Sequence, residues 1–194
     1  MAMSSFTLEN LQQQNPLFVF ALADEAAGEF TAYRSCFTGI GKVNAAYGLT
    51  KAIQQQRPGL IVNLGSAGST RFARQQVVCC TRFVQRDMDV SALGFAPYET
   101  PLSDLPLVLE NGLALEGLAK GTCGTGDSFE SNHQGDDYDV VDMEAYALAQ
   151  IAYREQLPFL CLKYISDGAD AGAAADWTTE VHRAALALRN VLEG

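Results

Sequence analysis

Positive charge is scarce in this sequence, which has 13 lysine and arginine residues against 23 aspartate and glutamate residues and a formal net charge of -10. An acidic surface repels phosphate backbones, so we expect no DNA or RNA binding through a basic patch. Docking on an anionic membrane is disfavoured for the same reason. No apolar run approaches the roughly 20 residues that span a bilayer. A small anionic ligand held by backbone amides stays compatible with this composition.

Histidine and closely spaced cysteine pairs are also scarce. His133 and His182 lie in unrelated contexts and no C-x-x-C pair is present, so we expect no metal site and no cofactor. The odd number of cysteines fits reduced thiols and predicts a cytoplasmic protein. The first 16 residues are polar and have no basic segment, so we expect no secretory signal. The cysteines are Cys36, Cys79, Cys80, Cys123 and Cys161; the adjacent pair fits core residues better than a redox site.

What the chain does have is the composition of an ordinary globular protein. Its 194 residues are 48% hydrophobic and 19% charged, which predicts one domain over residues 1–194. Strand-like apolar runs cover residues 17–22, 59–64, 76–84, 118–123 and 159–165. Helical patterns cover residues 42–56, 143–155 and 176–192. This alternation predicts an α/β fold in which helices cover a largely parallel or mixed sheet.

Two helical patterns and one loop give more specific expectations. In the last helix, Asp176 and Thr178 are candidates for the N-cap. Residues 87–105 contain glycine and proline without periodicity, which predicts a long loop. Phe95 and Tyr98 in this loop favour a pocket wall or a subunit contact over a plain surface excursion. The helix at residues 42–56 has an apolar stripe made of Val43, Ala46, Tyr47, Leu49, Ala52 and Ile53.

Polar or glycine-rich groups follow four apolar runs, and ligands of α/β sheets bind at the carboxyl ends of strands. Glu25 follows the first run, although it or Asp24 could equally cap a helix. The segment 65–68 combines small residues that let a ligand approach the backbone, or that simply form a turn. Phe129, in segment 126–130, could stack on a flat ring or fill the core. Glu144 and Asp167 border core-like sequence, which indicates a cleft with tuned carboxylates.

Five motifs in this order resemble the purine nucleoside phosphorylase and nucleosidase superfamily. They cover residues 37–45, 63–68, 126–129, 140–145 and 165–170. Within the superfamily, the chain is most similar to the methylthioadenosine/S-adenosylhomocysteine nucleosidases. The resemblance implies a three-layer α/β/α fold with a central mixed sheet. It also implies a homodimer, a place in methionine salvage and hydrolysis of the N-glycosidic bond of a purine nucleoside such as methylthioadenosine or S-adenosylhomocysteine.

The resemblance implies roles for three acids. Asp167 resembles the general acid that protonates or hydrogen-bonds N7 of the leaving purine, and general acid catalysis typically contributes about 10²–10⁴-fold. Glu144 resembles the acid on the ribose hydroxyls, where an anion stabilises an oxocarbenium-like transition state. Glu25 resembles the acid that positions the attacking water. The implied substrate-binding residues are Ser66 beside that water, Phe129 stacked on the base, Glu130 at the base edge, Met143 under the sugar and Ser166 beside the general acid.

Hydrolysis is favoured over two alternatives. A phosphorylase on the same fold would bind phosphate with arginines near the glycine motifs, but Arg34 and Arg71 do not stand at those positions, and Glu25 would repel phosphate. A non-catalytic purine-binding protein would have no need of three acids. Two features depart from the family pattern: the segment after Glu25 has room for only one brief strand, and Lys163 stands where nucleosidases commonly have arginine.

Overall fold

The structure, a computed structural model, describes residues 11–133, 136–170 and 173–193. Most of the polar first 16 residues therefore lie outside the described residues. The strands are β1 (Pro16–Phe20), β2 (Ser35–Phe37), β3 (Leu60–Gly68), β4 (Val77–Gln85), β5 (Ala119–Thr125), β6 (Val140–Asp142) and β7 (Phe159–Asp167). The α-helices are α1 (Ala23–Ala26), α2 (Lys42–Gln55), α3 (Ala145–Arg154) and α4 (Ala173–Glu193), and 3-10 turns cover Gln12–Gln14 and Ser91–Leu93.

The strands form one mixed sheet that closes partly on itself. Its order is β2-β1-β3-β6-β5-β4-β7, and an additional pairing joins β3 to β7. The pairings β4–β7 and β3–β6 are antiparallel, whereas the others are parallel. The β3–β6 contact is a single pair, Gly68 with Val141. This closure brings the carboxyl ends of β3 and β6 together.

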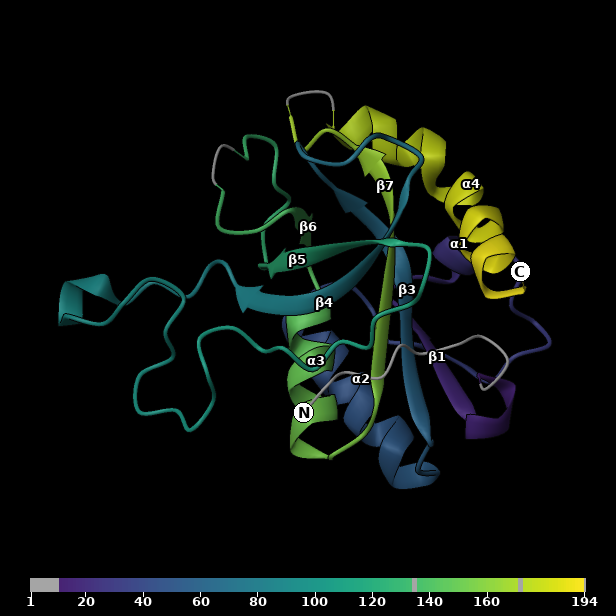
Figure 1. Cartoon of the computed structure of the whole chain (residues 1–194), viewed down its shortest axis with the longest axis horizontal. Helices are drawn as coiled ribbons and strands as arrows, with labels where there is room; N and C mark the ends of the chain where they lie inside the picture. The colour runs from purple at the N-terminus through teal and green to yellow at the C-terminus, as the bar shows by residue number, and fades with distance from the viewer. Residues whose placement is uncertain (1–10, 134–135, 171–172, 194) are drawn as a thin grey trace.

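Helices cover both faces of the sheet, and each face has its own apolar core. One core lies under α2 and α3, where Leu49, Ile53 and Ala149 are buried. The other lies under α1 and α4, where Ala26, Ala184 and Leu188 are buried. Figure 1 shows α1 and α4 on one side of the strands and α2 and α3 on the other. The expected three-layer α/β/α fold with a central mixed sheet is confirmed, while the single-domain organisation of residues 1–194 stays a prediction.

The element boundaries follow the sequence patterns, with two differences. Strand β3 continues through Gly68, so the segment 65–68 is strand with a register shift and not a turn after it. Helix α4 begins at Ala173, so Asp176 and Thr178 lie inside the helix and the expectation that they cap it is wrong. The single brief strand expected after Glu25 is β2.

The apolar stripe expected on α2 was too wide. Leu49 and Ile53 are buried, but Val43 and Tyr47 are 78% and 69% exposed. At about 100° per residue, these two side chains point almost opposite to Ala45 and Leu49, which face the core. Both apolar side chains are therefore exposed and face away from the core of the described residues.

The segment between β4 and β5 reaches away from the body of the molecule (Figure 1). As expected, residues 87–105 form a long loop whose regular structure is the turn Ser91–Leu93. Phe95 and Tyr98 are partly exposed in it, and Leu102 is 98% exposed. Across the described ranges, no helix is long and apolar enough to span a membrane.

Candidate active site

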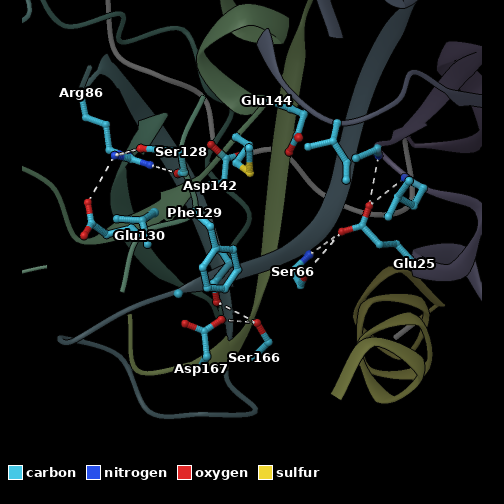
Figure 2. A pocket seen from close by; sticks show the side chains of 17 residues that line it. Glu25, Ser66, Arg86, Ser128, Phe129, Glu130, Asp142, Glu144, Ser166 and Asp167 are labelled. Carbon is cyan, nitrogen blue, oxygen red and sulfur yellow. Dashed lines mark hydrogen bonds and ion pairs between the residues drawn. The ribbon is translucent and has the colours of Figure 1, made fainter. Parts of the chain in front are cut away.

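The eight site residues expected from the sequence line one cavity. They come from segments that follow, or form the last residues of, five strands: β1, β3, β5, β6 and β7. Figure 2 shows Glu25 and Ser66 at one end of this cavity and Glu130 at the other, with Phe129 between them. The eight are Glu25, Ser66, Phe129, Glu130, Met143, Glu144, Ser166 and Asp167.

Glu25 serves both the short helix α1 and the cavity. Its Oε2 accepts hydrogen bonds from the backbone N–H groups of Ala21 and Leu22, each at 3.1 Å. Its Oε1 accepts hydrogen bonds from the N–H and the hydroxyl of Ser66, both at 3.2 Å. Glu25 is 6% exposed, whereas Asp24 lies exposed outside the cavity. Glu25 thus fits both interpretations that the sequence left open, because it accepts hydrogen bonds at the start of α1 and also lines the cavity.

The glycines of segment 65–68 make room for the acids. A Cβ on Gly65 would lie 3.0 Å from Glu25 Oε1, and a Cβ on Gly68 would lie 2.6 Å from Asp167 Oδ1. The second distance is shorter than real Cβ contacts allow, so alanine at position 68 would displace the carboxylate. The small residues were expected to let a ligand approach the backbone. Here they also let two carboxylates approach it, and the amide of Ser66 holds Glu25.

Asp167 is held in place by its neighbours in the chain. It is 3% exposed, Ser166 Oγ donates to its Oδ2 at 2.8 Å and the N–H of Ala169 donates to its Oδ1 at 2.8 Å. The Ser166 hydroxyl also lies 3.4 Å from the Ala67 carbonyl. Because a hydroxyl has one proton and can rotate, it can instead donate to the Ala67 carbonyl and accept a hydrogen bond from the carboxyl group of Asp167. The site therefore accommodates Asp167 with or without its proton.

Glu144 stands at the N-cap position of α3, and its Oε1 accepts the N–H of Gly41 at 2.9 Å. Burial raises the pKa of Glu144 to about 7, and the nearby carboxylate of Asp142 adds to this rise. The charge of Lys163 and the Gly41 hydrogen bond oppose it. The carboxyl group is therefore close to half ionised near neutral pH, so ionising it fully costs free energy.

Lys163 is a buried cation beneath this acid. Its Nζ lies 2.8 Å from Asp142 Oδ2, and both side chains are almost fully buried. Burial alone would lower the pKa of Lys163, but Asp142 and further groups hold it well above its usual value. Burial would likewise raise the pKa of Asp142, but Lys163 and the Thr125 hydroxyl lower it. At the position where the sequence resemblance led us to expect arginine, the chain thus has a lysine paired with one carboxylate.

The other end of the cavity is formed by the 126–130 loop, which we define as residues 126 to 130. Phe129 is 50% exposed there, so the alternative of a core phenylalanine is wrong. Arg86, which follows β4, also lines the cavity and forms an ion pair with Glu130 at 3.3 Å. Sequence reasoning missed Arg86 and Asp142 as site residues. Both stand at the end of an apolar strand, the same signal that identified Asp167.

Comparison with known proteins places the chain in a family. The model of the phosphorylase superfamily matches residues 28–193. The chain is 31% identical, over 77% of its length, to the 5′-methylthioadenosine/S-adenosylhomocysteine nucleosidase of Anoxybacillus flavithermus, of which 73% is covered. This chain belongs to the phosphorylase superfamily. The superfamily resemblance and the fold expected from the motifs are therefore confirmed. Glu25 precedes the residues that the family model matches, and the cavity geometry brings it together with the other site residues.

Solved structures share the fold with this superfamily member. A Helicobacter pylori MTAN variant with 5′-methylthioadenosine in its active site is 19% identical to this chain and superposes with a TM-score of 0.81. The superposition covers 93% of this chain and 98% of the Helicobacter pylori chain. A futalosine hydrolase mutant from the same organism is 18% identical to this chain and has a TM-score of 0.82. That superposition covers 93% of this chain and 97% of the hydrolase chain. The same fold thus carries an MTAN and a futalosine hydrolase, and the fold alone does not select a substrate.

Proposed function

We propose that this protein hydrolyses the N-glycosidic bond of an adenosine 5′-thioether, such as 5′-methylthioadenosine or S-adenosylhomocysteine, and releases the base. One observation carries the proposal: a single cavity is lined by Phe129, by Glu25 with Ser66 at one end, and by the two further acids Glu144 and Asp167. Relatives that cover most of the chain carry the nucleosidase name. A role in methionine salvage follows from this substrate as a prediction.

Asp167 and Glu144 each stabilise one of the two charges that develop when the bond is cleaved: the negative charge on the purine and the positive charge on the sugar. A purine is a poor leaving group as an anion, so a proton that Asp167 donates to N7 lowers the barrier. The sugar becomes an oxocarbenium-like cation, which an anionic Glu144 on the ribose hydroxyls stabilises more in the transition state than in the ground state. Met143, which lines the cavity beside Glu144, provides an apolar surface under the sugar.

Glu25 and Ser66 form a place for water and not for phosphate. Three backbone N–H groups fix Glu25, and if the Ser66 hydroxyl rotates away, Oε1 has capacity to accept a further hydrogen bond from water. A carboxylate at this position repels phosphate. Neither Arg34 nor Arg71 lines the cavity; they bond to the Gln56 carbonyl and to Asp139. The buried Arg86 lies at the end of the cavity opposite Glu25 (Figure 2). None of these three arginines is therefore placed to bind the phosphate that a phosphorylase would need beside Glu25.

The test is release of free adenine from 5′-methylthioadenosine and from S-adenosylhomocysteine, followed by chromatography in phosphate-free buffer. We expect release without phosphate, and none from the Asp167→Asn variant with an unchanged circular dichroism spectrum. Cleavage that strictly required phosphate would establish the phosphorylase alternative. Binding of the nucleoside without any cleavage would leave a purine-binding protein.

We further propose a homodimer. Val43 and Tyr47 on α2 and Leu102 in the 87–105 loop expose apolar surface, and burying such surface favours association. Tyr98 donates a hydrogen bond to Asp137 of its own chain at 3.0 Å, which leaves Phe95 as the aromatic residue to approach a neighbouring cavity. Light scattering should give twice the chain mass of 20.9 kDa. A fully active monomer would contradict this arrangement.

A cytoplasmic location remains part of the proposal. All five cysteines are free, and four of them are buried, Cys79 and Cys80 among them, as expected for core residues. Free thiols fit a reducing compartment. In the described segments, no group of three histidine, cysteine or acidic side chains could hold a metal ion, and the proposed chemistry calls for none.

A further inference from the structure

Arg86 is a buried cation that the proposed reaction does not use. It follows β4, its backbone N–H donates to the Thr125 carbonyl at 2.9 Å, and its side chain is only 6% exposed. Burying a guanidinium costs free energy unless other groups engage it. The groups that contact Arg86 therefore indicate its role.

The contacts of Arg86 converge on the two residues that flank Phe129. Its Nη1 lies 3.3 Å from both Ser128 Oγ and Glu130 Oε2, and its Nη2 donates to the Ser128 carbonyl. Figure 2 shows these contacts as dashed lines at the end of the cavity away from Glu25. Phe129 itself is half exposed, and no other ring in the described part of the chain stacks on it. The position of its ring thus depends on how its neighbours are held.

The beginning of the 126–130 loop is shaped around the same guanidinium. A Cβ on Gly126 would lie 2.9 Å from Arg86 Cζ and 3.1 Å from Nε. The Nε has no hydrogen-bond partner and is shielded from solvent, so the flat group lies against the bare Cα of Gly126. Alanine at position 126 would push the guanidinium away from Ser128 and Glu130.

We propose that Arg86 is a positioning residue: it fixes the 126–130 loop so that Phe129 presents its ring to the purine. The inference rests on the proposed nucleosidase function. A stacking contact holds the base in the substrate complex as well as in the transition state. Its loss therefore raises KM and weakens binding of free adenine while kcat changes little.

The experiment compares Arg86→Met with the matched control Arg82→Met, an exposed arginine within β4 that pairs with Glu110 at the surface. Adenine affinity is measured by calorimetry, and KM and kcat by adenine release. We expect Arg86→Met to weaken adenine binding and raise KM by about 10- to 100-fold, the range for loss of a base–aromatic stack. The control should bind adenine as the wild type does. Unchanged adenine affinity in Arg86→Met overturns the proposal.

A double-mutant cycle with Phe129→Ala decides whether Arg86 acts through Phe129. If it does, adding Arg86→Met to Phe129→Ala weakens adenine binding little further. Effects that multiply would overturn the proposal, because Arg86 would then contact the base independently. If Arg86→Met does not fold, Arg86→Lys and Gly126→Ala test the same idea: one lacks the forked donors and the other lacks the space. Unchanged affinity in both would refute it.

Free adenine separates this proposal from the function on which it rests. A wild-type protein that binds adenine but cleaves no nucleoside would refute the proposed hydrolysis and leave the binding cycle intact. A wild-type protein that does not bind adenine would overturn the positioning role itself.

Discussion

Replacing Glu144 by glutamine should make the protein more stable and inactive. In the folded protein the pKa of Glu144 is raised from 4.5 to about 7, mainly by burial. The glutamine amide oxygen can still accept the Gly41 N–H, which lies 2.9 Å from the present carboxylate oxygen. The substitution therefore removes the buried charge and keeps the hydrogen bond.

The expected gain in the free energy of unfolding of the Glu144→Gln variant depends on pH. The unfolded chain loses the Glu144 proton near pH 4.5, whereas the folded chain keeps it to about pH 7. Between these values the folded state binds more protons, so the wild type loses stability as pH rises. At about 1.4 kcal/mol per pH unit, the loss reaches about 3 kcal/mol above pH 7. Glutamine does not ionise, so the variant should match the wild type near pH 4 and exceed it by about 3 kcal/mol at pH 8.

Urea unfolding at pH 5 and pH 8 measures this difference, and thermal unfolding at pH 8 should show a rise of roughly 5–10 °C. Glu116→Gln, at an exposed position, serves as the control and should change stability little at either pH. A gain of equal size at both pH values would refute the reasoning, because the gain would then not come from ionisation of Glu144. Adenine release should be lost throughout, since the neutral amide cannot stabilise a cationic sugar.

Three further predictions follow from the cavity. Gly68→Ala should reduce the rate of adenine release by at least about 100-fold in a folded protein, because the new Cβ would lie 2.6 Å from Asp167 Oδ1. Near-wild-type turnover would show that Asp167 need not stay in its present position. The value of kcat/KM should fall as pH drops below about 7, where Glu144 becomes protonated in the free enzyme, and a profile flat from pH 5 to 8 would argue against an anionic role. Lys163→Met should lower the free energy of unfolding in urea by about 3–5 kcal/mol, since it leaves Asp142 buried without its ion-pair partner. Adding Asp142→Leu should restore part of that stability. If the losses of the two single variants were independent and additive, the pairing would be contradicted.

Much of the fold could be predicted from the sequence, because buried strands and long helices have strong periodic signals. The runs at residues 59–64 and 159–165 became the cores of β3 and β7. Periodicity did not tell which apolar helix residues face solvent. Val43 and Tyr47 are as apolar as their buried neighbours, yet they point away from the core. If the proposed dimer forms, the same residues would face a second chain, which no pattern within one sequence distinguishes from a core.

The candidate site was found through strand ends and motifs, and its missed members have a physical explanation. Asp167 ends a long apolar strand within a motif, so both signals coincide. Arg86 also follows a strand, but it opens a long loop, where a charged residue is most simply a solvated one. Its burial depends on Ser128, Glu130 and Gly126, about 40 residues further along the chain. Only the pairing of β4 with β5 brings that loop to it.

The glycines of β3 show how a motif can identify a site while the reason for its residues differs. From the sequence, small residues at positions 65–68 suggested a backbone open to a ligand. In the structure, a Cβ at position 65 would crowd Glu25 and one at position 68 would collide with Asp167. One glycine thus makes room for the acid proposed to hold water and the other for the acid proposed to protonate the base. A change at either glycine should therefore act on one acid alone, which separates the two roles without altering either carboxylate.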